Sequence, residues 1–161
     1  MFAKYKNGLY RFIKNPRTKK YEIVTNIREK FYPEFIEYKT GAYKEVTLDI
    51  IDLTDIFDVE LWVKYDCGYS VFSKEWEIAL SGQFLADGKL VLEGNGDIPG
   101  WFRPEKHVSR NYIPLNDIES AWVVYRYPKK DGVVLEKPLT IREDISIEKL
   151  IELRNYYGGK L

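Results

Sequence analysis

The residues best suited to chemistry lie together between positions 103 and 110. This stretch combines an imidazole, a carboxylate and two guanidinium groups: His107, Glu105, Arg103 and Arg110. An imidazole beside a carboxylate can transfer protons, and guanidinium groups can stabilise an anionic transition state. If residues 105–110 form a strand, Glu105, His107 and Ser109 share one face. The pattern supports one hypothesis, an enzyme that processes RNA or another phosphoester with His107. Such enzymes usually need a second histidine or a lysine beside the first. A protein without enzymatic activity is therefore the favoured hypothesis, and the enzyme stays an alternative.

A second group of residues is typical of protein recognition. Trp101, Phe102 and Arg103 end a glycine-rich loop, Gly94–Gly100, that follows a strand. Aromatic and arginine side chains are the usual anchors of protein interfaces. Acidic side chains at Asp55, Asp58 and Glu60 would steer a basic partner toward the same protein. We expect these six residues to form the protein-binding surface.

Aspartates recur at every third position from 49 to 58, at Asp49, Asp52, Asp55 and Asp58. On a helix this spacing would gather the carboxylates near one face, where they could bind a divalent cation. The surrounding valine, threonine and isoleucine residues favour a strand that breaks near 53–55, which scatters them. The spacing also differs from that of a calcium-binding loop. We therefore expect no metal site, and no motif indicates a cofactor.

The first predicted hairpin has a basic tip. Residues 9–14 and 21–25 have the composition of two strands, and Asn15-Pro16 starts the turn between them. Basic side chains close to aromatic ones can hold a nucleic-acid backbone and stack its bases. The four candidates for such contacts are Lys14, Arg17, Lys19 and Lys20. Because the net charge of the chain is zero, nucleic acid is the less favoured partner.

Composition and charge narrow the class of protein. The chain has 161 residues, a size typical of one domain, and 16% of them are aromatic. Residues 1–44 carry a net charge of +7 and residues 45–161 a net charge of −7. Cys67 is the single cysteine, and no stretch resembles a signal peptide or a membrane span. These features lead us to expect a cytoplasmic protein that does not contact membranes.

Strand patterns dominate the chain. The clearest is the hairpin that begins at Ser73, in which Trp76, Ile78, Leu80 and Phe84 alternate with polar or small residues. A two-residue Asp87-Gly88 turn would place Phe84 opposite Val91. We favour a three-residue turn, with Ala86 included, because it keeps the apolar residues on one face. Other predicted strands cover residues 34–38, 43–52, 59–64, 89–93, 120–127 and 133–135, with a short helical turn at 27–31.

One helix is expected, at about residues 146–157. Ser146 is a suitable N-cap, Gly158 suits the position after the last turn, and apolar residues recur at helical spacing between them. The whole pattern predicts a single mainly β domain over residues 1–161. We expect a curved antiparallel sheet or barrel-like meander of about nine or ten strands with one C-terminal helix. A two-layer α+β domain is the alternative, if residues 26–38 are more helical.

No catalytic set, nucleotide-binding loop or metal motif accounts for the chain, whereas the aromatic excess and the uneven charge are typical of binding proteins. The favoured hypothesis is a non-enzymatic protein-binding module, for example an inhibitor or immunity-type protein that acts on a larger partner. A small-ligand-binding β-barrel with an aromatic-lined pocket is the alternative from a different class. The phosphoester enzyme is the third.

Overall fold

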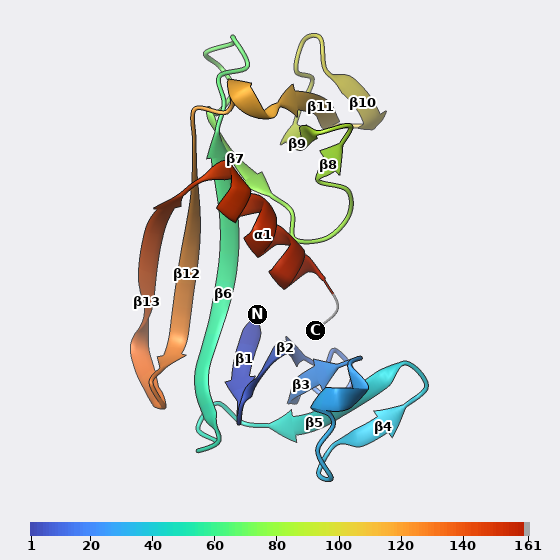
Figure 1. Cartoon of the computed structure of the whole chain (residues 1–161), viewed down its shortest axis with the longest axis vertical. Coiled ribbons are helices and arrows are strands. Elements are labelled where there is room, and N and C mark those ends of the chain that lie inside the picture. Colours follow the sequence, from blue (N-terminus) through green and yellow to red (C-terminus); the bar gives the residue numbers. More distant parts are fainter. Residues whose placement is uncertain (160–161) are drawn as a thin grey trace. The chain divides into compact units, whose positions relative to one another are not determined.

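The computed structural model describes residues 1–159 of the chain. It is mainly β, with 53% of residues in strands that pair antiparallel, and its one α-helix in this range lies near the C-terminus (Figure 1). The sheets are not closed. The predicted class, an antiparallel meander with a C-terminal helix, is therefore confirmed, in its open form.

Within residues 1–159, thirteen strands form two sheets, more than the roughly nine or ten that we expected. The nine-stranded sheet has the order β13-β12-β6-β1-β2-β3-β5-β4, with β7 also paired to β6, and the four-stranded sheet has the order β10-β11-β9-β8. The elements are β1 (Phe2–Tyr5), β2 (Gly8–Lys14), β3 (Tyr21–Thr25), β4 (Ile36–Tyr38), β5 (Gly41–Val46), β6 (Leu53–Lys64), β7 (Glu75–Ile78), β8 (Leu85–Ala86), β9 (Lys89–Asn95), β10 (Phe102–Glu105), β11 (Val108–Pro114), β12 (Ser120–Lys130), β13 (Val133–Ile145) and α1 (Ile147–Gly158).

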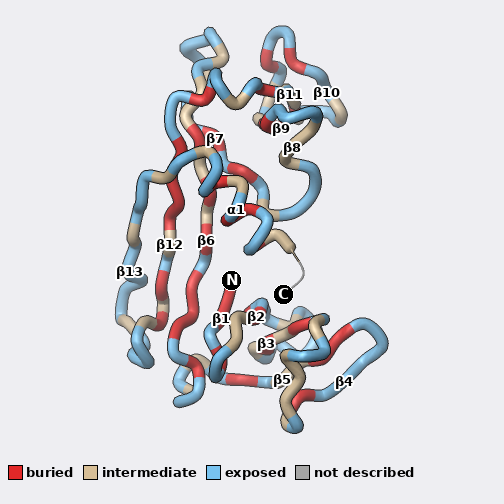
Figure 2. The backbone as a smooth tube through the Cα atoms, viewed as in Figure 1, coloured by how far each residue is buried: buried red, intermediate tan, exposed pale blue. Residues whose placement is uncertain are grey.

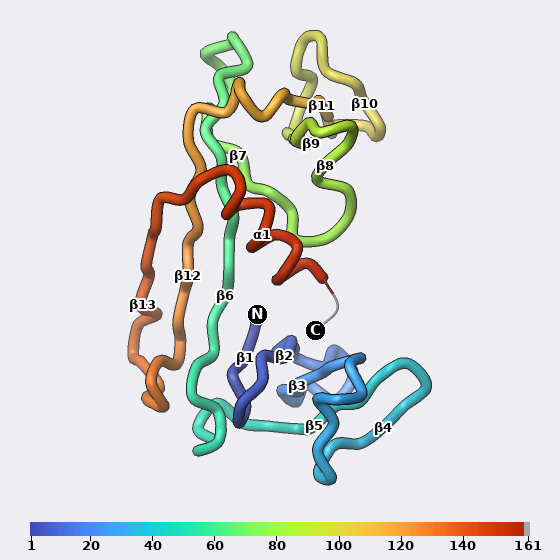
Figure 3. Tube along the Cα trace, viewed as in Figure 1, coloured from blue at the N-terminus to red at the C-terminus, as the bar shows by residue number. Residues whose placement is uncertain are grey.

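The chain divides into two compact units. The first unit contains residues 1–59 and 124–141 with Gly159, and the second unit contains residues 60–123 and 142–158. Strands β6, β12 and β13 each contribute residues to both units. Each can be followed as a continuous tube in Figure 3. Because three strands are shared in this way, a single domain over the whole chain stays our prediction.

The first unit is built on strands β1, β2, β3 and β5. Along β2, buried Tyr10 and Phe12 alternate with exposed Arg11 and Ile13, whereas β1, β3 and β5 contain mostly buried or half-buried residues (Figure 2). The buried cluster consists of Ala3, Tyr5, Tyr10, Phe12, Ile23, Phe35, Ala42, Val46, Leu53 and Ile56. Strand β1 was missed in the sequence, since its four residues give too short a pattern to recognise.

The segment between β3 and β4 contains a 3-10 turn over Arg28–Lys30. The Thr25 hydroxyl accepts a hydrogen bond from the Ile27 backbone N–H at 3.1 Å, which starts the turn. The helical turn predicted at 27–31 is therefore confirmed as a short 3-10 helix. Residues 26–38 contain no other helix, so the condition for the two-layer α+β alternative is not met.

The strand predicted over 43–52 is wrong in its second half. Strand β5 ends at Val46, residues 47–52 form a turn, and β6 then runs from Leu53 to Lys64 without the predicted break at 53–55. The turn is closed by hydrogen bonds from Ile50 N–H to the Thr47 carbonyl and from Leu53 N–H to the Ile50 carbonyl. The spacing of Leu48 and Ile50 resembles that of a strand because both side chains are partly buried, although the backbone forms a turn there.

The hairpin in the second unit has a two-residue turn, so the prediction of a three-residue turn is wrong. Leu85 pairs with Leu90 and Ala86 with Lys89, so Asp87 and Gly88 alone form the turn, with φ of 50° and 72°. Two residues with positive φ make a type I′ turn, whose twist matches that of the strands. Phe84 accordingly lies opposite Val91, whose backbone N–H donates to the Phe84 carbonyl at 2.8 Å.

Helix α1 begins as predicted. The Ser146 hydroxyl accepts a hydrogen bond from the Lys149 backbone N–H at 3.1 Å, which makes Ser146 the N-cap. Leu150, Leu153, Arg154 and Tyr157 are its buried residues. The role predicted for Gly158 is wrong, because the helix includes this residue. A Cβ there would lie 2.2 Å from the Leu80 carbonyl oxygen, so packing against the chain at Leu80 requires the glycine.

Candidate recognition surface

The second unit presents an open sheet face that carries aromatic and charged side chains in register. Phe102 of β10 pairs directly with Arg110 of β11, and Arg110 pairs directly with Glu93 of β9. Directly opposed residues in an antiparallel sheet point to the same face. Tyr112, two residues after Arg110, shares this face and lies opposite Val91. Val91 is only 6% exposed, so we use the name open face for the other four residues, Phe102, Arg110, Glu93 and Tyr112.

The other side of the same sheet is buried. Leu90, Leu92 and Ile113 alternate with the residues of the open face, and their side chains are 0–1% exposed. Ser109 is also fully buried: its hydroxyl donates to the Gly96 carbonyl at 2.7 Å and accepts from the Ile98 backbone N–H at 3.1 Å. Since one face makes the core, Glu93, Phe102, Arg110 and Tyr112 are presented on the other face, where Val91 beside them is buried.

An ion pair lies at the centre of the open face. Arg110 Nε donates to Glu93 Oε1 at 2.7 Å, and its Nη2 donates to the same oxygen. The pKa of Arg110 is raised, first by this hydrogen bond with Glu93, with a smaller contribution from the Tyr112 hydroxyl. The guanidinium is therefore held by Glu93 with help from Tyr112, and Phe102, its direct partner on β10, is 63% exposed.

The open face is hollowed on the side of β9. A cavity of about 560 Å³ is lined by Glu77, Ala79, Ser81, Gly82, Gln83, Phe84, Val91, Glu93, Asn95 and Arg110. A smaller one of about 300 Å³ follows along the same sheet, where Lys89 and Tyr112 lie with the Asp87 turn. Cavities of this size accept a few side chains or a small molecule.

One wall of the larger cavity is held by the helix. Arg154 of α1 is buried, and it donates from Nε to the Ala79 carbonyl at 2.6 Å and from Nη2 to the Gly82 carbonyl at 2.7 Å. Its guanidinium also lies 4.5 Å from the centre of the Phe84 ring. Burial lowers the pKa of Arg154. These contacts fix the segment 79–84, which sequence periodicity alone treats as part of a strand.

The three predicted anchors of the Gly94–Arg103 loop have different surroundings. Trp101 is 9% exposed, and its ring packs 5.1 Å from that of Trp76, so it supports the loop from inside. Phe102 faces solvent on the open face, and Arg103 forms an exposed ion pair with Asp97 at 3.1 Å. Hydrogen bonds join the loop to the β10–β11 hairpin, including one from Gly96 N–H to the His107 carbonyl. The loop predicted as flexible is thus tied to the sheet.

The residues of the phosphoester hypothesis are not brought together. Lys106 and His107 form the turn between β10 and β11, and His107 has a φ of 70°, so the predicted strand through 105–110 is interrupted there. The expected shared face of Glu105, His107 and Ser109 is therefore wrong. Arg110 is paired with Glu93 and Arg103 with Asp97. Within residues 1–159, none of the four candidate side chains has an ion pair or hydrogen bond with another.

The acidic candidates on β6 also differ from one another. Asp55 is 3% exposed, binds Lys4 at 2.8 Å and accepts a hydrogen bond from the Asp131 backbone N–H at 2.8 Å. Its burial acts to raise its pKa, but the hydrogen bonds from Lys4 and Asp131 outweigh burial, and the pKa is lowered. Asp58 is exposed and pairs with the N-terminal ammonium at 3.3 Å. Glu60 accepts a hydrogen bond from the Trp62 indole at 3.2 Å. Asp55 is thus a structural residue of the first unit.

The basic hairpin tip is organised by Asn15, as predicted for Asn-Pro. Its side-chain oxygen accepts hydrogen bonds from the Arg17 and Thr18 backbone N–H groups at 2.9 and 3.2 Å. Lys20 forms an ion pair with Glu45 at 2.7 Å, and the Lys14 ammonium lies 5.6 Å from the centre of the Tyr21 ring. Arg17 and Lys19 are exposed.

Three residues of the open face and its cavity escaped the sequence prediction: Glu93, Tyr112 and Phe84. Tyr112 and Arg110 alternate with buried Ser109 and Ile113, and this alternation was the available signal for a strand with an exposed aromatic face.

In the part of the chain that the structure describes, no group of three or more His, Cys, Asp or Glu residues is placed to hold a metal ion. Over the same residues, no helix has the length and apolar character to span a membrane. Comparison of the chain with protein-family models, with curated proteins and with solved structures finds no match.

Proposed function

We propose that the chain is a non-enzymatic protein-binding module and that the open face of the four-stranded sheet is its contact surface. The observation that carries this proposal is the row Phe102–Arg110–Glu93 across three strands, with Tyr112 beside it. Exposed aromatic residues grouped around an arginine have the composition of interface anchors. The adjoining cavity of about 560 Å³ offers room for a partner's side chain.

Charge on this face favours protein over nucleic acid. The larger cavity is lined by two carboxylates, Glu77 and Glu93, against one guanidinium, that of Arg110. Affinity for nucleic acid depends chiefly on an excess of cations that neutralise phosphates. A nearly balanced set of charges instead suits a polar protein surface, where complementary pairs set the register of the partner.

The finer role that we propose is the one expected from the sequence: an inhibitor or immunity-type protein in the cytoplasm that acts on a larger partner. The barrel form of the small-ligand alternative does not apply, because the sheets are open. The phosphoester alternative is less favoured, since Arg103 and Arg110 are paired with other carboxylates and His107 lies in a turn.

The test is a comparison of matched variants. The wild-type chain, Phe102→Ala, Arg110→Ala and the control Tyr69→Ala are immobilised, and proteins that bind from native extract are identified by mass spectrometry. Tyr69 is also exposed and aromatic but lies in the loop between β6 and β7. We expect a partner that wild type and Tyr69→Ala retain and that both open-face variants lose.

With the purified partner, removal of an anchor should weaken binding by about 30-fold, the factor that corresponds to a hot-spot residue. Capture that is equal for wild type and both open-face variants would remove the open face as the contact surface. Retention with Phe102→Ala and loss with Tyr69→Ala would move the interface to the β6–β7 loop.

A further inference from the structure

The ammonium group of Lys6, in the turn between β1 and β2, lies in a corner formed by two tyrosine rings. Its Nζ is 4.2 Å from the centre of the Tyr32 ring and 5.2 Å from the centre of the Tyr5 ring. The two rings are close to perpendicular, with centres 6.0 Å apart and planes inclined by 74°. Aromatic faces attract cations, and rings set at an angle to one another form the cages that bind ammonium groups. Tyr5 and Tyr32 are therefore two walls of such a cage, and Lys6 occupies it.

A carboxylate forms the third wall of the cage. Glu34 Oε1 accepts hydrogen bonds from the Lys6 ammonium and from the Tyr5 hydroxyl, each at 2.5 Å. These bonds, first that from Lys6, lower the pKa of Glu34 to about 2, so the carboxyl is ionised at neutral pH. Burial raises the pKa of Tyr5, so its hydroxyl stays a neutral donor. The corner thus combines two aromatic faces with one negative charge, a composition that favours a cation.

The aromatic walls are held by contacts that do not involve Lys6. Tyr5 is 1% exposed and packs edge-on against Tyr10 and Phe35. The Tyr32 ring also packs against that of Phe35, with ring centres 6.2 Å apart. The cage would therefore keep its shape when the lysine side chain leaves it, and a ligand would enter a preformed site.

Lys6 is the replaceable part of this arrangement. Its side chain is 38% exposed and that of Glu34 is 30% exposed, and ion pairs in contact with water contribute little to stability. The backbone of Lys6 has a φ of 49°, in the left-handed region that favours glycine or asparagine. Because the turn itself gives no reason for a lysine here, we connect this residue with the cage.

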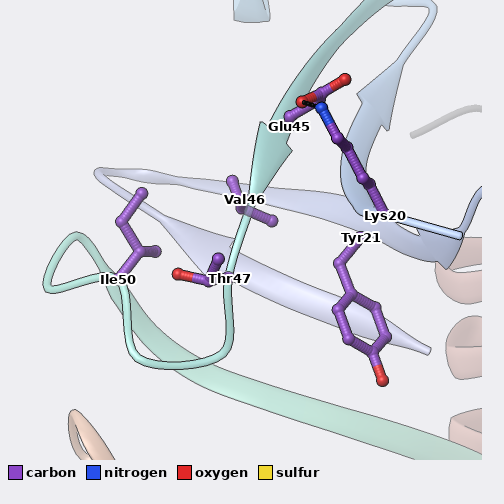
Figure 4. Close-up of a pocket in the computed structure, with 6 residues that line it drawn as sticks. All are labelled: Lys20, Tyr21, Glu45, Val46, Thr47 and Ile50. Carbon is purple, nitrogen blue, oxygen red and sulfur yellow. Dashed lines mark hydrogen bonds and ion pairs between the residues drawn. The ribbon is translucent and has the colours of Figure 1, made fainter. Parts of the chain in front are cut away.

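A cavity elsewhere in the first unit does not combine a ring and a charge in this way. Its volume is about 420 Å³, and its lining residues are Lys20, Tyr21, Glu45, Val46, Thr47 and Ile50 (Figure 4). Tyr21 and Val46 are direct partners in the β3–β5 ladder, and the ion pair between the residues that precede them, Lys20 and Glu45, lies on the other face. Among the lining residues, none on the side of the Tyr21 ring carries a charge, so nothing there selects a ligand.

We propose that Tyr5, Tyr32 and Glu34 form a binding site for a quaternary ammonium group, and that Lys6 fills this site until such a ligand replaces it. A quaternary ammonium group presents methyl groups to the rings and is less strongly hydrated than the lysine ammonium, so it loses less on leaving water. Free small molecules and trimethylated lysine side chains share this chemistry. The site lies in the first unit and needs no partner at the open face.

The test compares charged and neutral probes of the same shape on the whole chain. Choline is the charged probe, and 3,3-dimethyl-1-butanol is its neutral counterpart. Binding is followed by NMR through the amide shifts and through the Lys6 side-chain protons, which the Tyr32 ring should shift upfield. In wild type, choline at about 100 mM should move the Lys6 signals toward those of a solvated lysine, because a Kd of about 30 mM includes the displacement of Lys6. The butanol should leave these signals unchanged.

A third probe separates the two sources of the ligand. Nα-acetyl-Nε-trimethyl-lysine amide represents the modified side chain of a partner, whereas choline represents a free small molecule. Tighter binding of the lysine derivative would assign the site to a modified side chain, and tighter binding of choline would assign it to a free molecule. Either result supports the proposal.

Lys6→Gly empties the cage and suits the left-handed backbone of the turn. It should bind choline about tenfold more tightly than wild type, because no lysine has to be displaced. Lys19→Gly is the matched control and should bind like wild type, since Lys19 also has a positive φ, of 62°, but lies in the turn between β2 and β3. In the Lys6→Gly background, Tyr32→Leu and Glu34→Gln should each weaken choline about fivefold. Tyr38→Leu, which removes an exposed tyrosine of β4, should not.

The proposal is overturned if choline leaves the Lys6 signals of wild type unmoved, or if 3,3-dimethyl-1-butanol binds as tightly as choline. It is also overturned if Lys6→Gly binds choline no more tightly than Lys19→Gly, or if Tyr38→Leu weakens binding as much as Tyr32→Leu, because choline would then bind outside the cage. An unchanged amide spectrum away from the substituted residue checks that each variant is folded, and the wild-type experiment depends on no substitution.

Discussion

At the scale of single residues, polar side chains are matched with partners wherever they are buried. Within residues 1–159, no buried side-chain nitrogen or oxygen lacks a hydrogen bond. In the first unit, Glu34 Oε1 accepts from the Tyr5 hydroxyl and the Lys6 ammonium, each at 2.5 Å. Tyr5 also packs edge-on against Tyr10 and Tyr32. Glu34 therefore fastens the segment before β4 to an aromatic cluster.

This contact makes the stability of the first unit depend on pH. The hydrogen bonds from Lys6 and Tyr5 lower the pKa of Glu34 from 4.5 to about 2. A carboxyl whose pKa is lower in the folded state stabilises the fold above its unfolded pKa, and the contribution is lost as pH falls toward the folded pKa. Between pH 4.5 and about 2, wild type should therefore lose more stability than Glu34→Gln does.

The measurement is urea unfolding followed by far-UV circular dichroism across that range, with Glu37→Gln as the control for loss of one carboxylate. Glu37 is exposed on β4, and its variant should follow the wild-type curve. Parallel curves for wild type and Glu34→Gln would show that Glu34 does not contribute.

At the scale of elements, helix α1 and the segment 79–84 depend on each other in the second unit. Arg154 binds the Ala79 and Gly82 carbonyls, and Gly158 admits the Leu80 carbonyl beside the helix. Gly82 and Phe84, which belong to the same segment, also line the cavity beside the open face. The helix therefore holds one wall of the cavity beside the proposed recognition surface.

Gly158→Ala is the sharpest test of this support, because helix propensity and packing predict opposite signs. Alanine favours a helix over glycine by about 1 kcal/mol. Its Cβ would lie 2.2 Å from both the Leu80 oxygen and Arg154 Nη1, a distance that forces the chain to shift. Overpacking typically costs about 1–3 kcal/mol, so we expect net destabilisation by roughly 1 kcal/mol in urea unfolding followed by tryptophan fluorescence.

Asn155→Ala, at an exposed position of the same helix, is the control and should be neutral or slightly stabilising. A stabilised Gly158→Ala would mean that the helix end does not pack against Leu80.

At the scale of the whole molecule, the question is whether the two units unfold together. Strands β6, β12 and β13 supply residues to both, so neither unit has a complete set of strands of its own. All four tryptophans, Trp62, Trp76, Trp101 and Trp122, belong to the second unit. Tryptophan fluorescence therefore follows the second unit, whereas circular dichroism follows both.

Asp55→Asn separates the two possibilities, because Asp55 lies in the first unit. The variant loses the ion pairs with Lys4 and Lys130, at 2.8 and 3.6 Å, and should be destabilised by about 1–3 kcal/mol. If the chain is one cooperative domain, the tryptophan transition should shift by the same amount as the circular dichroism transition.

Asp58→Asn, which alters an exposed carboxylate on the same strand, should shift neither transition by more than about 0.5 kcal/mol. A tryptophan transition that stays in place in Asp55→Asn, while the circular dichroism signal changes, would contradict the single-domain prediction.

Local patterns in the sequence were sufficient for several of the strands, the capped helix and the antiparallel fold class. Alternation along residues 59–64, the Asn15 turn and the Ser146 cap depend on neighbours within a few positions, so the chain itself specifies them. Tertiary structure decided which side chains meet. Phe102, Arg110 and Glu93 align because β11 pairs with both β10 and β9, and pairing between distant strands has no local signature. Tertiary packing also buried Trp101 and Asp55, and the β10–β11 hairpin set His107 in its turn. The candidate site therefore lies on the sheet beside the expected loop.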